Sequence, residues 1–259
     1  MRLILFLLLL NFLSPQQGKK LENVNKYAVC YSKVNPDEVK GFELLIVDPE
    51  HYSRDEVLNF KNLGIITVAY LNIAEFEEYR NYSIPESLII GKNPFWEGHF
   101  YVEVRSEIWQ RLIFDEIIPK IISKGFDGFF IDMIDIVQIF PQFRDTIINM
   151  VKSIKLRYED KIVIANNGWS LIDTLKNFVD AFLVEGLFTR YDFVKKRYFV
   201  RFEREYRDRV KILKGTGKKI FTLDFLPDGD RRRYFIQNLS RNYGFTSYIS
   251  TIELNKVYR

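Results

Sequence analysis

Short apolar runs recur along the chain after residue 25, and segments with a helical pattern separate most of them. Eight such runs are present, at residues 26–32, 42–50, 65–76, 126–135, 161–168, 179–188, 219–225 and 245–250. None of them alternates between apolar and polar positions, as a strand with one exposed face would. Continuous apolar runs of this length are typical of parallel strands that are buried on both faces of a sheet.

The segments between the runs predict helices. One of them, residues 53–64, begins with the capping box Ser53–Glu56 and ends at Gly64, where a glycine commonly terminates a helix. A second, residues 106–124, contains Pro119 and should be kinked there. The remaining predicted helices are 143–158, 170–178, 191–214 and 230–243.

Alternation of strands and helices defines the expected fold class. Eight strand–helix units in about 235 residues match an α/β chain folded as a single-domain (β/α)₈ TIM barrel. A doubly wound open sheet is the alternative, but the glycine-rich G-x-G-x-x-G turn of many such folds is absent. The connection over residues 77–105 is long, and connections of this length are usually functional lids or disordered loops.

The first 20 residues differ from the rest of the chain. Met1 and Arg2 precede the apolar run LILFLLLLNFL at residues 3–13, which is too short for an ordinary membrane span. This layout is typical of a secretory signal peptide, and an uncleaved membrane tether through residues 3–13 is the alternative. We therefore expect residues 1–20 to be a targeting segment, residues 21–259 to form the barrel, and the protein to be secreted or located in the cell envelope.

Carboxylates follow two of the predicted strands directly. Asp132 comes after the run FFI in the fourth strand, and Glu185 comes after AFLV in the sixth. In barrels of this class the active site forms at the carboxyl ends of the strands, and alternate strands contribute one inward layer. Two such backbones lie roughly 9–10 Å apart, so the side chains can approach to the spacing of a glycosidase acid pair. Asp132 and Glu185 are therefore the predicted catalytic pair.

The two acids are expected to have different roles. An apolar setting raises the pKa of a carboxyl group, which favours Glu185 as the proton-holding acid/base. Asp132 has polar neighbours at its strand end and is expected to be the ionised nucleophile. Asp135, three residues further on, fits the role of a helix cap better than a catalytic role.

Other residues at strand ends or in the long connection are candidates for substrate binding. They are Asp48, Asn72, Glu75, Trp96, Asn166, Trp169 and Asp224. Trp96 and Trp169 are included because aromatic rings can stack on sugars, although each could equally belong to the core.

Composition excludes several kinds of chemistry. The only cysteine is Cys30, so the chain can form no internal disulfide and no iron–sulfur cluster. Only two histidines are present, which argues against a metal site built from several of them. We expect no metal and no cofactor, but with this many acids a metal-dependent hydrolase of another bond remains an alternative.

Several ordered motifs resemble glycoside hydrolase family 114, the polygalactosaminidase-like barrels. They are TVAYLNIAEFEEYR (67–80), NPFWEGHFYVEV (93–104), GFDGFFIDMID (125–135), IANNGWSLI (164–172) and VDAFLVEGLF (179–188). The resemblance implies an endo-acting hydrolase of α-1,4-linked galactosamine polymers that needs no cofactor. It places the acid pair on Asp132 and Glu185, and it implies a sugar subsite lined by Asp48, Tyr70, Glu75 and Asn166. The segment 72–74 and the pair Asp224-Phe225 depart from the family pattern, which bears on the exact substrate.

Charge along the chain suggests a cationic partner. The chain is formally +4 with a pI near 8.9, but its basic residues concentrate in the segment 190–211, which we expect to be an outer helix. The acids cluster at strand ends, and a cleft lined by one sign of charge attracts the opposite sign. The expected partner is a cationic amino-sugar polysaccharide and not a nucleic acid. A catalytically inactive carbohydrate-binding barrel is the alternative from a different functional class.

Overall fold

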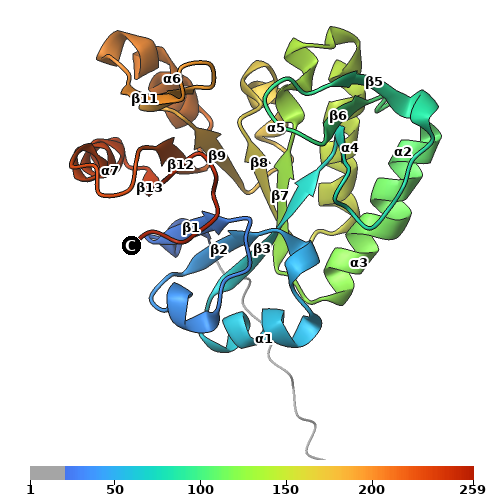
Figure 1. Ribbon diagram of the computed structural model, residues 1–259, viewed down its shortest axis with the longest axis horizontal. Helices are drawn as coiled ribbons and strands as arrows, with labels where there is room; N and C mark the ends of the chain where they lie inside the picture. The colour runs from blue at the N-terminus through green and yellow to red at the C-terminus, as the bar shows by residue number, and fades with distance from the viewer. Residues whose placement is uncertain (1–20) are drawn as a thin grey trace, which may run out of the picture.

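Eight parallel strands surround a common axis in the computed structural model, which describes residues 21–259 (Figure 1). Neighbouring strands pair in the order β1-β2-β3-β7-β8-β9-β12-β13. These strands are Tyr27–Cys30, Leu44–Val47, Ile66–Asn72, Gly128–Asp132, Ile162–Asn166, Ala181–Glu185, Lys219–Phe225 and Thr246–Ser250. Each lies within one of the predicted apolar runs, so the predicted (β/α)₈ class and its single domain are confirmed.

Side chains and loop segments close the barrel between its first and last strands. Within residues 21–259, no strand ladder joins β1 to β13. Instead the ring of Tyr27 packs against the rings of Phe221 and Tyr248, at centroid distances of 4.8 and 5.7 Å. At the carboxyl end of β1, the backbone N–H of Tyr31 donates to the carbonyl of Leu254 at 2.8 Å. The barrel is thus nearly closed and has a packed interior.

Helices cover the outside of the strands (Figure 1). The capping box at the first helix forms as predicted: Ser53 N–H donates to the Glu56 carboxylate at 2.8 Å, and Glu56 N–H donates to the Ser53 hydroxyl at 3.3 Å. Gly64 follows with a φ of 81°, a left-handed conformation that costs glycine little. In the described part of the chain the α-helices are α1 (Arg54–Asn62), α2 (Glu107–Arg111), α3 (Ile118–Ser123), α4 (Arg144–Arg157), α5 (Ile172–Leu175), α6 (Glu203–Gly215) and α7 (Arg232–Asn242).

Pro119 disturbs the helical segment 106–124 as predicted, and the structure shows how. A π-helical turn, Leu112–Ile117, separates α2 from α3, and Pro119 lies in the first turn of α3. Proline has no N–H to donate and its ring crowds the carbonyl four residues earlier. The wider π turn accommodates both effects without ending the helix.

One predicted helix is wrong in its first half. The segment 191–214 begins as a hairpin of β10 (Thr189–Asp192) and β11 (Arg197–Val200), and only then continues as α6. The Asp192 carboxylate accepts the backbone N–H groups of Val194 and Lys195, at 3.1 and 2.9 Å. Such a side-chain-to-backbone bond stabilises a turn in competition with a helix. The basic residues of this segment are therefore divided between a hairpin and a helix.

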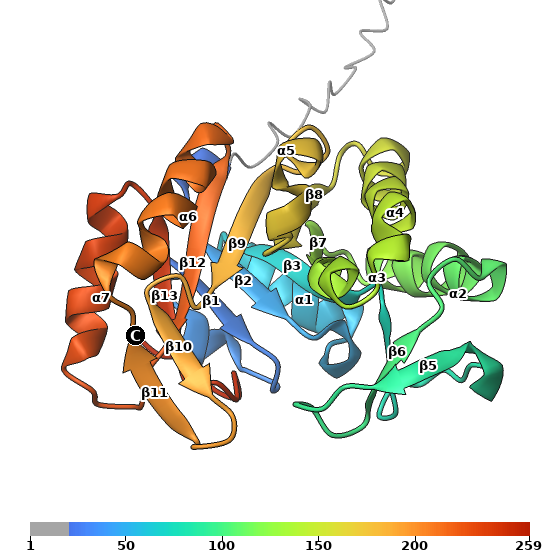
Figure 2. The same ribbon diagram turned by 90° about the horizontal axis from the view of Figure 1, so that it is seen from above.

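The long connection after β3 forms a small sheet rather than an unstructured loop. Its strands are β4 (Glu75–Glu77), β5 (Ile89–Lys92) and β6 (His99–Val102), which pair antiparallel in the order β4-β6-β5. This sheet and the β10–β11 hairpin lie on opposite sides of the barrel end toward which the parallel strands run (Figure 2). Both additions therefore border the mouth of the barrel.

The predicted targeting segment, residues 1–20, lies outside the described residues. Among residues 21–259, no helix combines the length and the apolar character needed to cross a membrane.

The close approach of β7 to β8 yields a test of the fold. A Cβ added to Gly128 would lie 2.2 Å from the carbonyl oxygen of Ile162, whereas one added to Gly215 in α6 would meet nothing within 4 Å. We expect Gly128→Ala to destabilise the fold by about 3 kcal/mol in urea unfolding, since backbone must move to relieve the clash. Gly215→Ala is the control, with an expected change between zero and a gain of about 1 kcal/mol. Equal stabilities for the two variants would contradict the packing of β7 against β8.

Candidate active site

A cavity of about 310 Å³ opens at the carboxyl ends of the strands. It gathers most of the residues that the sequence predicted for a site, namely Asp48, Tyr70, Glu75, Trp96, Asp132, Asn166 and Glu185. It also includes residues that the sequence pattern did not indicate, among them Tyr31, Tyr79, Asn93 and His99. Within residues 21–259, the cavity lining contains no lysine and no arginine.

Asn166 joins the two predicted catalytic acids. It ends β8, between Asp132 at the end of β7 and Glu185 at the end of β9. Its side-chain Nδ2 donates to Asp132 Oδ1 at 2.8 Å and to Glu185 Oε1 at 3.0 Å. Because both bonds start from one nitrogen, the two acceptor oxygens lie at most about 5.8 Å apart, the limit that these two distances set.

Hydrogen bonds surround the Asp132 carboxylate. Besides Asn166, the backbone N–H of Met133 donates to Oδ1 at 2.8 Å, and the Tyr70 hydroxyl lies 3.1 Å from Oδ2. Met133 has a φ of 63°, a left-handed conformation that non-glycine residues seldom adopt. Removal from bulk water raises the pKa of Asp132, while the bonds from Asn166, Met133 and Tyr70 oppose that rise by favouring the ionised form.

Glu185 has fewer partners and a different protonation state. Asn166 is the one side chain that donates to its carboxyl group among the described residues. Removal from bulk water, followed by the negative charge of Asp132, raises the pKa of Glu185 to about 8. The pair shares its protons, and Asp132 ionises first because it accepts more hydrogen bonds. Near neutral pH Glu185 therefore holds a proton.

A buried charge cluster lies behind Asp132. The Tyr70 hydroxyl oxygen, 3.1 Å from Asp132 Oδ2, also lies 2.9 Å from Glu77 Oε1, so its single proton is shared between the two carboxylates. Arg80 forms ion pairs with Glu77 through Nε and with Asp48 through Nη1, the latter at 2.6 Å. The side chains of Arg80, Glu77 and Asp48 are all at most 7% exposed. These pairings hold Tyr70 in the position from which it reaches Asp132.

A second cluster holds Glu75. Its carboxylate accepts from Asn93 at 2.7 Å, from Asn72 at 3.3 Å and from His99 Nδ1 at 3.1 Å. Burial lowers the pKa of His99, but the hydrogen bond to Glu75 and the nearby Glu77 charge outweigh it and raise the pKa above its usual value. Glu75 therefore lies in the cavity wall with its charge partly balanced by His99.

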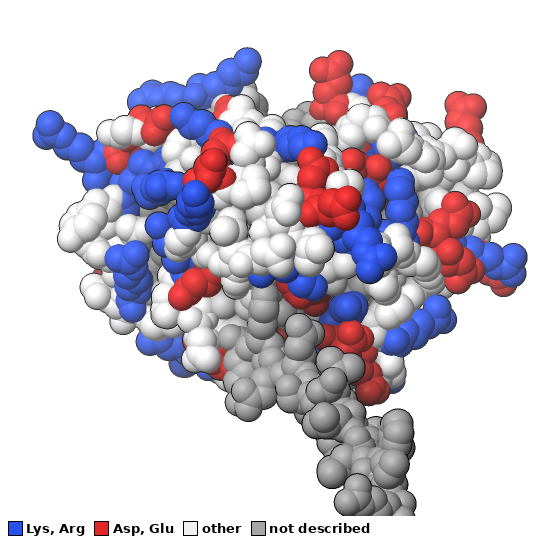
Figure 3. Space-filling model, turned by 90° about the horizontal axis from the view of Figure 1, so that it is seen from below, with Lys and Arg blue, Asp and Glu red and all other residues white. Residues whose placement is uncertain are grey.

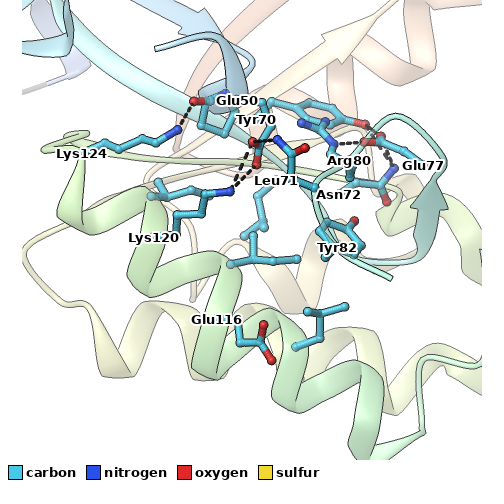
Figure 4. A pocket seen from close by; sticks show the side chains of 15 residues that line it. Glu50, Tyr70, Leu71, Asn72, Glu77, Arg80, Tyr82, Glu116, Lys120 and Lys124 are labelled. Carbon is cyan, nitrogen blue, oxygen red and sulfur yellow. Dashed lines mark hydrogen bonds and ion pairs between the residues drawn. The ribbon is translucent and has the colours of Figure 1, made fainter. Parts of the chain in front are cut away.

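Asn72, one of the predicted substrate-binding residues, lines a different pocket. Figure 4 shows this smaller cavity of about 80 Å³, which lies between Lys120 and Lys124 on one side and Arg80 and Tyr70 on the other. Tyr70 lines both cavities and so separates them. Because Asn72 Nδ2 donates to the Tyr70 hydroxyl at 3.2 Å and to Glu77 at 3.0 Å, its place in the structure is that of a positioning residue.

Asp224 and Trp169 do not line the main cavity either. Asp224 is fully buried, and its Oδ1 accepts the backbone N–H groups of Phe188 and Thr189, both at 2.8 Å. It thereby fixes the turn that follows Glu185, and burial raises its pKa to about 6. Trp169 lies beside the guanidinium of Arg209, which is 5.2 Å from the ring centroid. Both residues therefore lie outside the cavity lining, and of the two Asp224 positions the turn after Glu185.

Potential metal ligands are not grouped in the described chain. Within residues 21–259, no three or more His, Cys, Asp or Glu side chains are arranged to hold a metal ion.

Known proteins resemble this chain in sequence and in fold. The sequence profile described as "Glycoside-hydrolase family GH114" matches residues 12–259. An uncharacterized protein of Methanocaldococcus jannaschii is 27% identical over 274 aligned residues, covering 89% of this chain and 77% of that protein. An uncharacterized protein of Thermotoga maritima is 26% identical, covering 82% of this chain and 73% of that protein.

Two solved structures share the fold. The glycoside hydrolase domain of PelA from Pseudomonas aeruginosa has a TM-score of 0.78 at 19% identity, with 90% of this chain and 96% of that one covered. Ega3 of Aspergillus fumigatus, solved in complex with galactosamine, has a TM-score of 0.74 at 13% identity, with 95% of this chain and 98% of that one covered.

The raised pKa of Glu185 predicts a pH-dependent stability difference. Between the ordinary carboxyl pKa of 4.5 and about 8, the folded protein holds a proton that the unfolded chain has released. Unfolding then releases protons, so rising pH destabilises the fold across this window. Glu185→Gln removes the effect. We expect the variant to gain stability over the wild type by more than about 1.4 kcal/mol between pH 5 and pH 8, the equivalent of one pKa unit.

Urea unfolding at both pH values measures this gain. Glu107→Gln, at an exposed position of α2, is the control and should show no pH-dependent difference of that size. A Glu185→Gln difference that is the same at pH 5 and pH 8 would show that Glu185 has an ordinary pKa.

Proposed function

We infer that this chain, which belongs to glycoside-hydrolase family GH114, cleaves α-1,4-linked galactosamine polymers. We propose that it cuts at internal bonds of the polymer and retains the anomeric configuration. The chain is a glycoside hydrolase by its family. The substrate, the endo mode and the stereochemistry are the proposed part. In this proposal Asp132 is the nucleophile and Glu185 is the acid/base.

The Asn166 bridge is the observation that supports a retaining reaction. Inverting glycosidases separate their carboxyl groups by about 6.5–9.5 Å to admit a water, whereas retaining enzymes hold them about 5–5.5 Å apart. The bridge keeps the acceptor oxygens of Asp132 and Glu185 within about 5.8 Å. This spacing favours direct attack by Asp132 on the sugar.

The protonation states match the two steps of such a reaction. In the first step the ionised Asp132 attacks the anomeric carbon, while Glu185 gives its proton to the departing glycosidic oxygen. In the second step Glu185, now ionised, takes a proton from water, and the resulting hydroxide displaces Asp132 from the sugar. Each group ends in the state in which it began. The Tyr70 hydroxyl is placed to stabilise the Asp132 carboxylate when it is released.

The charge of the cavity supports an amino-sugar substrate. The lining contains Asp48, Glu75, Asp132, Asp135 and Glu253, besides Glu185, which holds a proton near neutral pH. Lys and Arg side chains gather instead over the α6–α7 side of the molecule, on the left of Figure 3. A cleft with one sign of charge concentrates ligands of the opposite sign, whatever the total charge. A polymer of protonated galactosamine fits this field, and Ega3 was solved with galactosamine.

Asn166 offers a specific contact for such a substrate. Its side chain is 5% exposed, and its Oδ1 has no hydrogen-bond partner among the described residues. Leaving a buried amide oxygen unpaired is costly, so a ligand that supplies a donor gains affinity there. An ammonium or hydroxyl group of the bound sugar is such a donor.

Location outside the cytoplasm remains part of the proposal and rests on the sequence of residues 1–20 alone. A secreted or envelope-bound enzyme would meet polysaccharide directly. Mass spectrometry of the native protein tests this point: a soluble cytosolic form that begins at an intact Met1 would contradict it.

Kinetics of two isosteric variants test the reaction. We expect Asp132→Asn and Glu185→Gln each to lower kcat on deacetylated galactosaminan by about 10³-fold or more, with the circular dichroism spectrum unchanged. Glu107→Gln on α2 is the control and should keep full activity. NMR should detect the α anomer first among the products, and a chelator should leave the rate unchanged. Inverted product, or near-normal turnover by either variant, would contradict the assignment.

Ionic strength tests the charge argument. Salt screens exposed charges over about 8–10 Å near physiological concentrations. We therefore expect kcat/KM on the deacetylated polymer to fall at least threefold between 50 and 500 mM NaCl, and full N-acetylation to abolish most cleavage. Rates that are indifferent to salt and equal on both polymers would mean that the acids do not select the substrate.

A further inference from the structure

Aromatic side chains join the two structures that border the mouth. Phe95 and Trp96 lie in the connection between β5 and β6, and Phe193 lies in the turn between β10 and β11. The ring of Phe193 is 5.0 Å from that of Phe95 and 5.6 Å from that of Trp96, measured between centroids. We call Phe95, Trp96 and Phe193 the aromatic clasp. It connects insertions that follow β3 and β9, strands separated by β7 and β8.

The β10–β11 hairpin carries a row of rings on one face. Tyr191 pairs with Tyr198 across the hairpin, at a centroid distance of 4.7 Å, and Phe193 packs on Tyr191 at 5.0 Å. Side chains alternate between the two faces of a strand, so Arg190 and Arg197 belong to the other face, where each lies over the ring of Phe199. The hairpin therefore separates an aromatic face from a basic one.

The aromatic face is continuous with the main cavity. The Tyr198 hydroxyl accepts the backbone N–H of Ile252 at 3.2 Å, and Ile252 lines the cavity. Trp96 lines the cavity as well and contacts Phe193 at the other end of the row. A polymer that leaves the catalytic carboxylates on this side therefore meets rings from both insertions.

The exposure of these rings is more typical of a ligand-binding surface than of a hydrophobic core. Phe95 is 57% exposed and Trp96 is 41% exposed, although both already contact Phe193. An aromatic pair contributes only about 0.5–1.5 kcal/mol beyond the area that it buries. The contact is thus weak enough to rearrange around a bound sugar, and binding would cover apolar area that water now reaches.

We propose that the aromatic clasp is a distal binding site for the same polysaccharide strand whose scissile bond lies at Asp132 and Glu185. The inference rests on the proposed function and extends it to sugars beyond the reacting pair. The C–H face of a pyranose packs on an aromatic ring, and a protonated amine is attracted to the π face of Trp or Phe. The clasp therefore selects for chain length and supports cleavage within long polymers.

The matched variants Phe193→Ala and Val194→Ala test the clasp. Val194 is the next residue in the turn and is 92% exposed, so its truncation controls for changes in the turn itself. Each variant is assayed on a long deacetylated galactosaminan and on a short chromogenic oligomer that reaches only the sugars beside the carboxylates. We expect Phe193→Ala to lower kcat/KM on the polymer about tenfold and on the oligomer less than twofold. Phe193→Tyr, which keeps the ring, should restore the polymer activity.

Other outcomes would overturn the inference. Equal losses on both substrates would mean that the clasp only shapes the catalytic cavity. A faster reaction of Phe193→Ala on the polymer would mean that the rings obstruct the strand. Losses in Val194→Ala as large as in Phe193→Ala would assign the effect to the turn.

Binding without cleavage separates this inference from the proposed function. In the Glu185→Gln background, adding polymer should change the tryptophan fluorescence, and the change should be lost when Trp96→Phe is added. The other tryptophans, Trp109 and Trp169, are outside the cavity lining and serve as the constant background. A fluorescence response from a wild type that cleaves no polymer would retain the clasp and refute the hydrolysis. Cleavage of the polymer with no fluorescence response from Trp96 would retain the hydrolysis and refute the clasp.

Discussion

One side-chain amide sets the geometry on which the site depends. Asn166 is at the end of the middle strand of three, and it donates to an acid on each neighbouring strand. The backbone just beyond these strands is bent to make the arrangement possible. Met133 and Asn167 both have positive φ angles, of 63° and 53°. The Met133 N–H thereby turns onto Asp132, and the Asn167 side chain accepts the N–H of Glu185 at 3.1 Å. Such strained residues persist only where their surroundings compensate for them, and they concentrate at functional sites.

Electrostatic consequences follow from that geometry. Two carboxyl groups held this close in a setting shielded from water cannot both ionise easily, so one of them keeps a proton. In the proposed reaction the more richly hydrogen-bonded Asp132 is the anion, and Glu185, whose pKa is raised to about 8, is the acid. The chain of contacts from Tyr70 through Glu77 to Arg80 then fixes the anion from behind. Burying these charges is costly, and the cost is offset because each has a partner of opposite sign or a donor.

Much of the fold and half of the site could be predicted from the sequence. The eight apolar runs lack alternation because both faces of a barrel strand are buried, and acids that directly follow such runs must lie at the mouth. Asp132, Asn166 and Glu185 were expected at the mouth for this reason, and the structure brings all three into one cavity. The bridging role of Asn166 was not predictable, because it depends on which neighbours the amide reaches in three dimensions. The same limit applies to Asp224, which looks like a strand-end acid but bonds the turn after Glu185. Residues 191–200 were predicted as part of a helix because their many charged side chains obscured a short alternation between the two faces of a strand. The turn at Asp192 was overlooked for the same reason.

Detection of a covalent intermediate on Asp132 is the most direct test of its proposed role as the nucleophile. Glu185→Gln should slow the step that releases the sugar, since no base then activates water, so the intermediate should accumulate on an activated galactosaminide whose leaving group needs no acid. Mass spectrometry of the peptic digest then locates the added sugar. We expect one glycosyl unit on the peptide that contains Asp132 and none on the same peptide of Asp132→Asn. An unmodified Asp132 peptide together with an inverted product would contradict the role of Asp132 as nucleophile.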